Sequence, residues 1–390
     1  MTAPSLPAPA PPLRAPVGLE GVVLCETRVS HVDGRRGRYR YRDHDAVELA
    51  RTRTLEDVWH LLLEGELPER ERAAAFRARL GELRVLPLEL ERALTAAFAP
   101  RAADDPMAAL RTAVSLLGDV LAWPAMIDLD EREVHVQAVR TCALLPTLVA
   151  ALHRLATRRP IVAPDPALGQ AAAFLQMLHG RPPEPAHARA LEQYMILAAD
   201  HGMAASTFAG RVIASTGADF AAAITGAIGA LGGPLHGGAP DRALEMLDAI
   251  GTPAGTDPWL RDCLARGERV MGFGHRVYRA PDPRARMLRE LAARLDSPRI
   301  ALAEHVESRA TALLEQVKPG HDLRVNVEFY AAVTMEQVGV PPSLFGSTFA
   351  IARSPGWSAH IIEQIRDNRL IRPLTEFAGG PLRPVPEGDL

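Results

Sequence analysis

The sequence FAAAITGAIGALGGPLHGG occupies residues 220–238, and it indicates both the fold class and the place of the chemistry. Its first part, Phe220 to Leu231, is almost entirely apolar and rich in alanine and glycine, whose small side chains let neighbouring helices approach closely. We predict a deeply packed helix or a helix at a subunit interface, with an ordinary core helix as the alternative. The second part places His236 among glycines, which let the backbone turn sharply and let a ligand approach the main chain.

A second histidine has the same kind of surroundings. His275 lies in Gly-Phe-Gly-His-Arg, residues 272–276, and a carboxylate, Glu328, follows in Asn-Val-Glu-Phe-Tyr, residues 326–330. Histidine can donate or accept a proton near neutral pH. Arg284, Arg353 and Arg372 lie in the same C-terminal half of the chain. Two imidazoles, one carboxylate and several fixed cations indicate acid–base chemistry on an anionic substrate.

The composition is that of a soluble globular enzyme. The chain has 390 residues, of which 47% are apolar and 23% charged, a length that suits two domains. A net charge of −3 excludes a global basic field that would recruit nucleic acid. The three cysteines, Cys25, Cys142 and Cys263, are widely spaced and odd in number, which excludes a disulfide framework and favours a reducing cytoplasm.

The N-terminal residues 1–16 are crowded with proline and alanine. Proline interrupts any apolar core of a signal peptide, so we predict a disordered tail. No run reaches the roughly 18 uncharged apolar residues that a membrane-spanning helix needs, and the longest candidate, Phe220 to Leu231, is too short. The sequence therefore predicts a soluble protein.

The predicted fold is mainly α, with a short β region near the N-terminus. Residues 38–41 alternate arginine and tyrosine, which is typical of a strand. Thr54 and Asp57 form a capping-box pattern, and Gly65 is placed to end the helix that begins there. Towards the C-terminus the pattern predicts two separate helices, over 342–351 and 356–366.

Several common active-site motifs are absent from the sequence. It contains no Rossmann fingerprint, no P-loop and no zinc signature. A Gly-x-Ser-x-Gly elbow is also missing, which argues against a serine hydrolase. Asp200-His201-Gly202 remains open, because a histidine beside an aspartate at a helix end can be structural or functional.

Ordered motifs extend over nearly the whole chain. They are Gly18-Leu19-Glu20-Gly21-Val22-Val23, Asp200-His201, Ala205-Ser206-Thr207-Phe208, Gly233-Pro234-Leu235-His236-Gly237-Gly238-Ala239, Gly272-Phe273-Gly274-His275-Arg276-Val277-Tyr278, Asp282-Pro283-Arg284, Ala352-Arg353, Gly356-Trp357-Ser358-Ala359-His360 and Asn368-Arg369-Leu370-Ile371-Arg372-Pro373. From about residue 18 to residue 373 the chain therefore resembles the citrate synthase family of bacteria.

This resemblance implies a helical homodimer with two domains in each subunit. The large domain would comprise residues 17–232 and 336–390, and a smaller, mobile domain would comprise residues 233–335. Closure of the small domain would exclude water and align the reactants.

The resemblance also implies a reaction of the tricarboxylic acid cycle, in which an acyl-CoA condenses with oxaloacetate and the thioester is then hydrolysed. His236 would hydrogen-bond the thioester carbonyl, Glu328 would remove the α-proton, and His275 would polarise the ketone of oxaloacetate. The residues that would hold oxaloacetate are His201, Arg284, Arg353 and, from the partner subunit, Arg372. No metal and no cofactor is implied, since coenzyme A arrives as part of a substrate. A thioester α-proton is so weakly acidic that the base needs a donor on the carbonyl oxygen.

Three positions depart from the family pattern. Glu328 stands where the family has aspartate, and Ala204 and Pro240 stand where it usually has asparagine. Glutamate is longer by one carbon–carbon bond, about 1.5 Å, and a misplacement near 1 Å can cost about a hundredfold in rate. Two alternatives to a citrate synthase therefore stay open. One is a 2-methylcitrate synthase that uses propionyl-CoA, and the other is a weakly active paralogue that binds oxaloacetate or coenzyme A.

Overall fold

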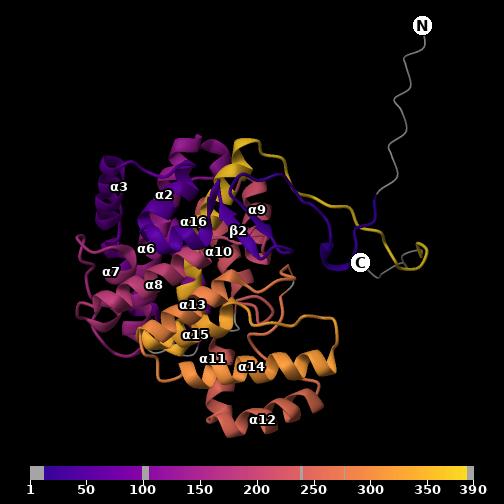
Figure 1. Cartoon of the computed structure of the whole chain (residues 1–390). Helices are drawn as coiled ribbons and strands as arrows, with labels where there is room; N and C mark the ends of the chain where they lie inside the picture. The colour runs from indigo at the N-terminus through magenta and orange to yellow at the C-terminus, as the bar shows by residue number, and fades with distance from the viewer. Residues whose placement is uncertain (1–12, 99–104, 238–239, 276, 384–390) are drawn as a thin grey trace, which may run out of the picture.

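The computed structural model describes residues 13–98, 105–237, 240–275 and 277–383, and within these ranges the chain is mainly helical, as predicted (Figure 1). Of the predicted tail, residues 1–12 lie outside the described residues. The α-helices in these ranges are α1 (Ala46–Thr52), α2 (Leu55–Glu64), α3 (Arg70–Leu83), α4 (Leu88–Phe98), α5 (Pro106–Val120), α6 (Glu131–Ala156), α7 (Gln170–His179), α8 (Pro185–Ala198), α9 (Ala205–Ser215), α10 (Phe220–Leu231), α11 (Pro240–Ile250), α12 (Pro253–Ala265), α13 (Pro283–Arg294), α14 (Ile300–Val317), α15 (Val327–Gln337) and α16 (Phe345–Arg366).

A small antiparallel sheet precedes the helices. Its strands are β1 (Ser30–Asp33), β2 (Arg38–Tyr41) and β3 (His44–Asp45), in that spatial order. The predicted alternation in β2 is confirmed, because Tyr39 and Tyr41 are buried while the two arginines are exposed. The Tyr41 hydroxyl donates a hydrogen bond of 2.8 Å to the carbonyl of Ile196 in α8, so the sheet is attached to the helical core.

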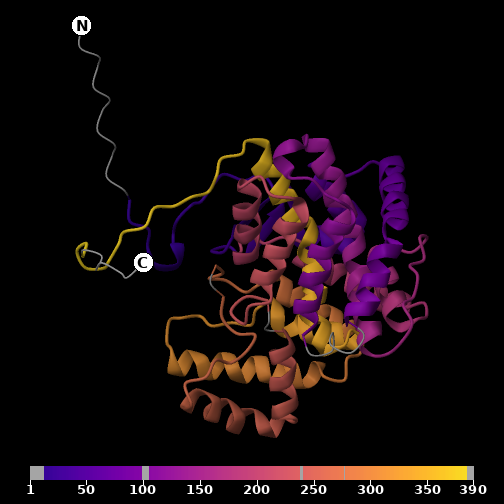
Figure 2. The ribbon, with the colours of Figure 1, turned by 180° about the vertical axis from the view of Figure 1, so that it is seen from behind.

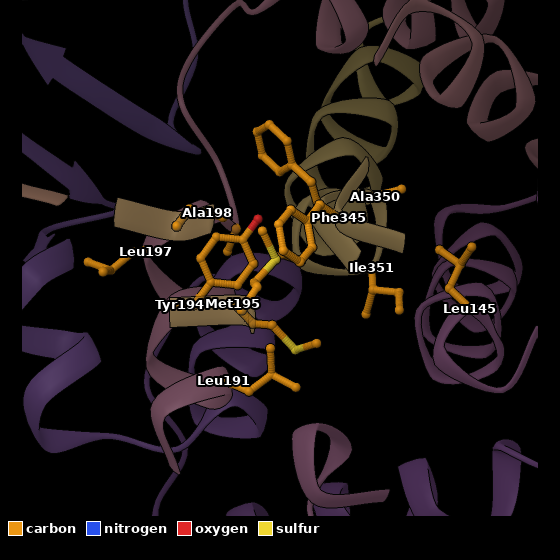
Figure 3. Close-up of a cluster of buried hydrophobic side chains, with 14 of the residues drawn as sticks. Leu145, Leu191, Tyr194, Met195, Leu197, Ala198, Phe345, Ala350 and Ile351 are labelled. Atoms are coloured by element: carbon orange, nitrogen blue, oxygen red, sulfur yellow. The ribbon is translucent and has the colours of Figure 1, made fainter. Parts of the chain in front are cut away.

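The centre of the molecule is built from α6, α8 and α16. In Figure 3, Leu145 of α6, Met195 of α8 and Ile351 of α16 belong to one cluster of buried side chains. The nearly all-apolar stretch from Leu144 to Leu155 forms the second half of α6. Within the described part of the chain α6 is the one helix long and apolar enough to cross a membrane, but 83% of its apolar window is buried, as expected of a core helix.

One prediction about the C-terminal region is wrong. The two helices predicted over 342–351 and 356–366 are a short 3₁₀ turn, Pro342–Leu344, followed by the single helix α16, which runs through Pro355. Proline inside a helix removes a backbone N–H and costs about 3 kcal/mol. Here the Ser354 hydroxyl donates a hydrogen bond of 2.9 Å to the carbonyl of Ile351, which proline leaves without its usual partner.

The next residue, Gly356, lets α16 pass close to the end of α8. A Cβ atom at this position would lie 2.3 Å from the carbonyl oxygen of Ala199 and 2.6 Å from Oδ1 of Asp200. We therefore expect Gly356→Ala to lower the free energy of unfolding by about 2–4 kcal/mol through overpacking, as measured by urea denaturation. Gly229→Ala is the control, since its Cβ meets nothing closer than 3.5 Å. An equal effect of both substitutions would contradict this prediction.

The helices from α11 to α15 lie together on one side of the molecule, at the bottom of Figure 1 and again in the reverse view of Figure 2. Within this group α13 packs against α15, and both also contact α8 of the central bundle. The loops that carry His236 and His275 connect α10 to α11 and α12 to α13. The domain boundaries predicted at residues 233 and 335 stay a prediction.

Candidate active site

The loop that carries His275 is attached to the start of α15. Gly272 and Gly274 have φ angles of +77° and +85°, a region that favours glycine. Phe273 forms an isolated antiparallel bridge with Val325, and the Gly274 N–H donates a hydrogen bond of 2.7 Å to the carbonyl of Arg324. The two glycines thus let the loop run alongside the segment that leads to Glu328.

The imidazole of His275 is held in one tautomer. Its Nδ1 accepts hydrogen bonds from the N–H groups of Val277 (3.0 Å) and Tyr278 (3.1 Å), so the neutral ring carries its proton on Nε2. Burial, with the nearby Arg284 guanidinium, lowers the pKa of His275 to about 4. The ring is therefore neutral at physiological pH, and its Nε2–H is available as a donor.

Arg284 brings a second donor to the same place. Its Nη2 lies 3.3 Å from Nε2 of His275, and both atoms carry hydrogen. Neither atom can accept from the other, and an anionic oxygen between them could accept from both. Arg284 is only 3% exposed and pairs with Asp282 through Nε (3.0 Å) and Nη2 (2.8 Å). Burial lowers the pKa of Arg284, but the Asp282 carboxylate outweighs burial and raises it, so the cation is permanent.

The ring of His201 packs against that of His275. The ring centroids are 5.4 Å apart, and Nε2 of His201 is 3.2 Å from the hydroxyl of Tyr278. Burial, together with the positive charge of Arg284, holds the pKa of His201 well below its ordinary value. His201 is therefore neutral and adds a polar ring nitrogen to the cationic cluster.

Arg353 of α16 is a buried cation with little compensation. It is 2% exposed, and its Nε donates a hydrogen bond of 2.6 Å to the carbonyl of Ala198. Burial lowers its pKa, and the charge of Asp200 works in the opposite direction. Among the residues that the structure describes, no carboxylate forms an ion pair with Arg353. A buried charge without a contacting partner is costly, so an anionic ligand would be stabilising here.

His236 is also fixed in one tautomer, which is the opposite of that of His275. Its Nε2 accepts from the backbone N–H of Ser206 (3.3 Å) and lies 2.8 Å from the Ser206 hydroxyl, which itself accepts from Nε1 of Trp357 at 3.1 Å. The proton of the neutral ring is therefore on Nδ1. Burial, followed by the charge of Arg353, lowers the pKa of His236 to about 4, so the ring offers a neutral N–H donor.

Glu328 lies in the first turn of α15, where its position is set by Asn326. The Asn326 side chain accepts from the Glu328 N–H (3.0 Å) and donates to the carbonyl of Gly274 (3.0 Å). Burial raises the pKa of Glu328 to about 7, with the charge of Arg284 acting in the opposite direction. Within the described ranges its carboxylate forms no hydrogen bond or ion pair. A carboxyl group with this pKa can exchange protons at neutral pH.

Most of the predicted site residues belong to one electrostatic group. Arg284 influences the pKa of His201, of His275 and of Glu328, while Arg353 influences the pKa of His201 and of His236. Arg372 is different, since it is exposed in the extended C-terminal segment. The catalytic and binding roles given to these residues stay predictions. No group of His, Cys, Asp and Glu side chains in the described ranges could hold a metal ion.

Sequence reasoning missed four residues that support this group: Tyr278, Asp282, Ser206 and Trp357. Each lies inside a quoted motif, so its place in the sequence was visible. Their partnerships were not visible, because Ser206, His236 and Trp357 come from three segments that meet only in the folded chain.

Two of the departures from the family pattern lie at helix N-termini. Ala204 is the N-cap of α9 and provides no side-chain hydrogen bond. Pro240 is the first residue of α11, a position where the missing N–H of proline is tolerated.

We expect Ala204→Asn to raise the free energy of unfolding by about 1 kcal/mol, because an asparagine side chain can accept from the N–H of Thr207 in the first turn of α9, where the N–H of Ser206 already donates to His236. The extended backbone at residue 204 (φ −63°, ψ 159°) suits an N-cap. Chemical denaturation measures the effect, and Ala205→Asn, one residue further into the helix, is the control. A stability equal to or below that of the unaltered protein would refute the capping argument.

Comparison with known proteins gives a consistent result. The family model described as "Citrate synthase, C-terminal domain" matches residues 18–374. The chain is 39% identical to a citrate synthase of Haloferax volcanii over 368 residues, 93% of this chain and 95% of that protein. It is 38% identical to the putative citrate synthase 2 of Mycobacterium tuberculosis over 373 residues, 94% of each chain.

Solved structures agree with these sequence relatives. The citrate synthase of Thermotoga maritima is 33% identical with a TM-score of 0.84, over 95% of this chain and 97% of that one. A citrate synthase from Thermoplasma acidophilum, in a ternary complex with carboxymethyl coenzyme A and oxaloacetate, has a TM-score of 0.87 at 27% identity over the same shares. A family model that covers most of the chain, relatives of this identity and the shared helical fold lead to one conclusion: the chain belongs to the citrate synthase family and is a condensing enzyme of the citrate synthase type.

Proposed function

We propose that the chain condenses acetyl-CoA with oxaloacetate and hydrolyses the thioester, releasing citrate and free coenzyme A. The observation that carries this proposal is the pair of donors at 3.3 Å, Nε2 of His275 and Nη2 of Arg284, together with the buried Arg353, which no carboxylate contacts among the described residues. Cationic and neutral donors that converge in this way suit a small substrate with two carboxylates and a ketone.

In the proposed first step the Glu328 carboxylate removes a proton from the α-carbon of the acetyl group. The developing charge on the thioester oxygen is stabilised by Nδ1–H of His236, which the Ser206 contacts leave as the protonated nitrogen. A base with a pKa near 7 and a neutral donor with a pKa near 4 can act together on one acyl group at neutral pH.

In the second step the enol carbon bonds to the ketone carbon of oxaloacetate, and the ketone oxygen takes a proton from Nε2 of His275. Neutral imidazole can donate this proton because the N–H groups of Val277 and Tyr278 donate to the other ring nitrogen, Nδ1, which leaves the proton on Nε2. His201, Arg284 and Arg353 hold the substrate carboxylates. Water then hydrolyses the thioester, which yields a third carboxylate and the free thiol.

We infer further that the protein is a homodimer in which Arg372 reaches the substrate of the neighbouring copy. The N-terminal segment from residue 13 and the C-terminal segment up to residue 383 leave the body of the molecule together (Figures 1 and 2), joined by an ion pair between Arg14 and Glu376. They expose large apolar side chains, with Val17 at 96% and Phe377 at 85%. A second copy would cover these side chains, and sedimentation equilibrium tests this proposal.

The proposed domain division, with residues 233–335 as the mobile unit, would let the loops of His236 and His275 close on bound substrate. The backbone of the β1–β2 turn meets one of these loops, since the N–H of Arg279 donates a hydrogen bond of 2.8 Å to the carbonyl of Gly34. This contact supports closure of the site between the N-terminal sheet and the His275 loop.

The decisive experiment mixes the protein with oxaloacetate and either acetyl-CoA or propionyl-CoA and follows free thiol. We expect thiol release with acetyl-CoA. Faster release with propionyl-CoA would instead identify a 2-methylcitrate synthase. A folded dimer that releases no thiol with either thioester would refute the proposed reaction.

The longer acid at position 328 favours a second candidate, a paralogue that binds oxaloacetate with little turnover. Under that alternative, calorimetry detects oxaloacetate binding and Glu328→Asp raises thiol release. Under our proposal the site is built around glutamate, because Asn326 fixes the backbone of residue 328, and Glu328→Asp lowers the rate.

We expect the rate to depend on the ionisation of Glu328. Its raised pKa of about 7 means that the carboxyl group loses its proton, and becomes a base, as the pH rises through 7. Below pH 7, kcat/KM should therefore fall about tenfold for each pH unit, and above pH 8 it should be constant. His236 and His275, each with a pKa of about 4, should add no step between pH 5.5 and 8. A profile that is flat across pH 7 would contradict the role of Glu328 as the base.

A further inference from the structure

A chain of buried polar side chains runs behind His201. Asp200 and His360 are completely buried, and Arg211 is 4% exposed. Oδ1 of Asp200 lies 3.4 Å from Nε2 of His360, and Nδ1 of His360 lies 3.1 Å from Nη1 of Arg211. The same Nη1 donates a hydrogen bond of 2.8 Å to Oε2 of Glu363. Four ionisable groups from α9, α16 and the end of α8 thus form a continuous series of contacts in space.

The direction of the hydrogen bonds follows from the chemistry of arginine. A guanidinium can only donate, so Nδ1 of His360 accepts and the proton of its neutral ring is on Nε2, facing Asp200. Oδ1 of Asp200 and Nε2 of His360 are both buried, and neither has a hydrogen-bond partner elsewhere among the described residues. Each is therefore the natural partner of the other, across a gap only slightly longer than a hydrogen bond.

One end of this chain of side chains lies next to His201, in the candidate active site. The other oxygen of Asp200, Oδ2, accepts from the Ser30 hydroxyl and from the N–H of Gly202 (2.9 Å). Asp200 and Gly202 flank His201, so the orientation of the Asp200 carboxylate sets the backbone on both sides of that histidine. The negative charge of Asp200 also opposes the effect of burial, which lowers the pKa of Arg353, without an ion pair between the two, so the guanidinium stays available to a ligand.

The other end lies at the C-terminal segment. Nε of Arg211 donates to Oε1 of Gln364 (3.1 Å), and Nε2 of Gln364 donates to Oδ1 of Asn368 (3.2 Å). Ser215, the last residue of α9, also contacts this segment: its carbonyl accepts from Nδ2 of Asn368, and its hydroxyl accepts from the N–H of Ile371, each at 3.1 Å. The residue that follows Ile371 is Arg372.

We propose that Asp200, His360 and Arg211 form a positioning chain that fixes His201 at one end and the segment carrying Arg372 at the other. His360 is the central positioning residue, and it touches no substrate. The proposal rests on the proposed function, because it assigns both ends of the chain to oxaloacetate. It implies that ordering of oxaloacetate beside His201 also orders residues 367–372.

The first test compares His360→Asn with the unaltered enzyme. Asparagine can still accept from Arg211 but is too short to reach Asp200 as well. We expect the KM for oxaloacetate to rise about tenfold, with the KM for acetyl-CoA changed less than about twofold. His60→Asn is the matched control. His60 is also buried (3% exposed), and its Nδ1 forms one hydrogen bond, of 2.9 Å, with the carbonyl of Glu66.

The second test does not depend on turnover. Trypsin cleavage after Arg369, followed by mass spectrometry, reports on the order of the C-terminal segment. We expect oxaloacetate to slow this cleavage in the unaltered protein and in His60→Asn. In His360→Asn we expect the rate of cleavage to stay unchanged, even at saturating oxaloacetate. Calorimetry measures the affinity of each protein for oxaloacetate and so sets the saturating concentration. If His360→Asn does not fold, Arg211→Lys, which retains the charge beside Glu363 but not the bond to Gln364, takes its place.

The outcomes separate this proposal from the proposed function. One outcome overturns the positioning chain alone. In it the unaltered protein releases thiol, and a folded His360→Asn variant has a normal KM for oxaloacetate and normal protection from trypsin. Oxaloacetate binding without thiol release refutes the proposed reaction. In that case the trypsin experiment still tests the positioning chain. A protein that does not bind oxaloacetate refutes both.

Discussion

Glu328→Gln should lower kcat by about 10³-fold, since a general base contributes roughly 10²- to 10⁴-fold to a proton transfer. Glutamine has nearly the same shape but cannot take the α-proton, so the fold and the binding of oxaloacetate should be preserved. The carboxylate of Glu328 has no bond within the described ranges that its loss would break. Stopped-flow or steady-state thiol assays measure kcat, and calorimetry measures oxaloacetate affinity.

The control for this variant lies on the same helix. Glu336 of α15 is also a glutamate, and it pairs with Arg299. Glu336→Gln should leave kcat within about twofold, because surface ion pairs contribute only about 0–1 kcal/mol. If Glu328→Gln retains more than a tenth of the activity, or if its remaining activity still rises with pH through 7, another group is the base.

His236→Ala should lower kcat by about 10²- to 10³-fold, the usual effect of removing one donor from an oxyanion site. The tautomer explains why a neutral histidine can act here: contacts with Ser206 occupy Nε2 and leave Nδ1–H as the donor. His236→Asn should recover part of the loss, because an asparagine amide can place an N–H close to the position of Nδ1. Both variants should bind oxaloacetate as the unaltered protein does.

A histidine outside the candidate site provides the control for His236. His153 in α6 is partly buried, and burial lowers its pKa as well. His153→Ala should leave kcat within about twofold while lowering stability. Equal losses in His236→Ala and His153→Ala would mean that the effect of His236 is structural and not catalytic.

The helices and several of their ends were predictable from the sequence, because they depend on neighbouring residues. The capping box of Thr54 and Asp57 and the αL conformation of Gly65 are present as predicted. Helix α10 has the predicted bounds, Phe220–Leu231. Local rules failed at Pro355, where the pattern predicts a break and the structure has one continuous helix.

The residues of the candidate site could be named from the sequence because glycines surround His236 and His275 and because the motifs occur in family order. Their protonation could not be predicted. The tautomers of His236 and His275 depend on N–H groups from a distant segment or a turned loop, and the pKa of Glu328 depends on burial. Neither quantity is a property of the neighbouring residues in the chain.

By itself, then, the sequence determined the helical class, the family and the identity of the candidate acid–base groups, since these follow from periodicity, caps and ordered motifs. Only the tertiary structure decided which ring nitrogen carries each proton, that Arg353 is buried without a contacting carboxylate among the described residues, and that Asp200, His360 and Arg211 form one line. The physical reason is that hydrogen bonds and desolvation act between atoms that are close in space, and here those atoms come from segments up to about 160 residues apart.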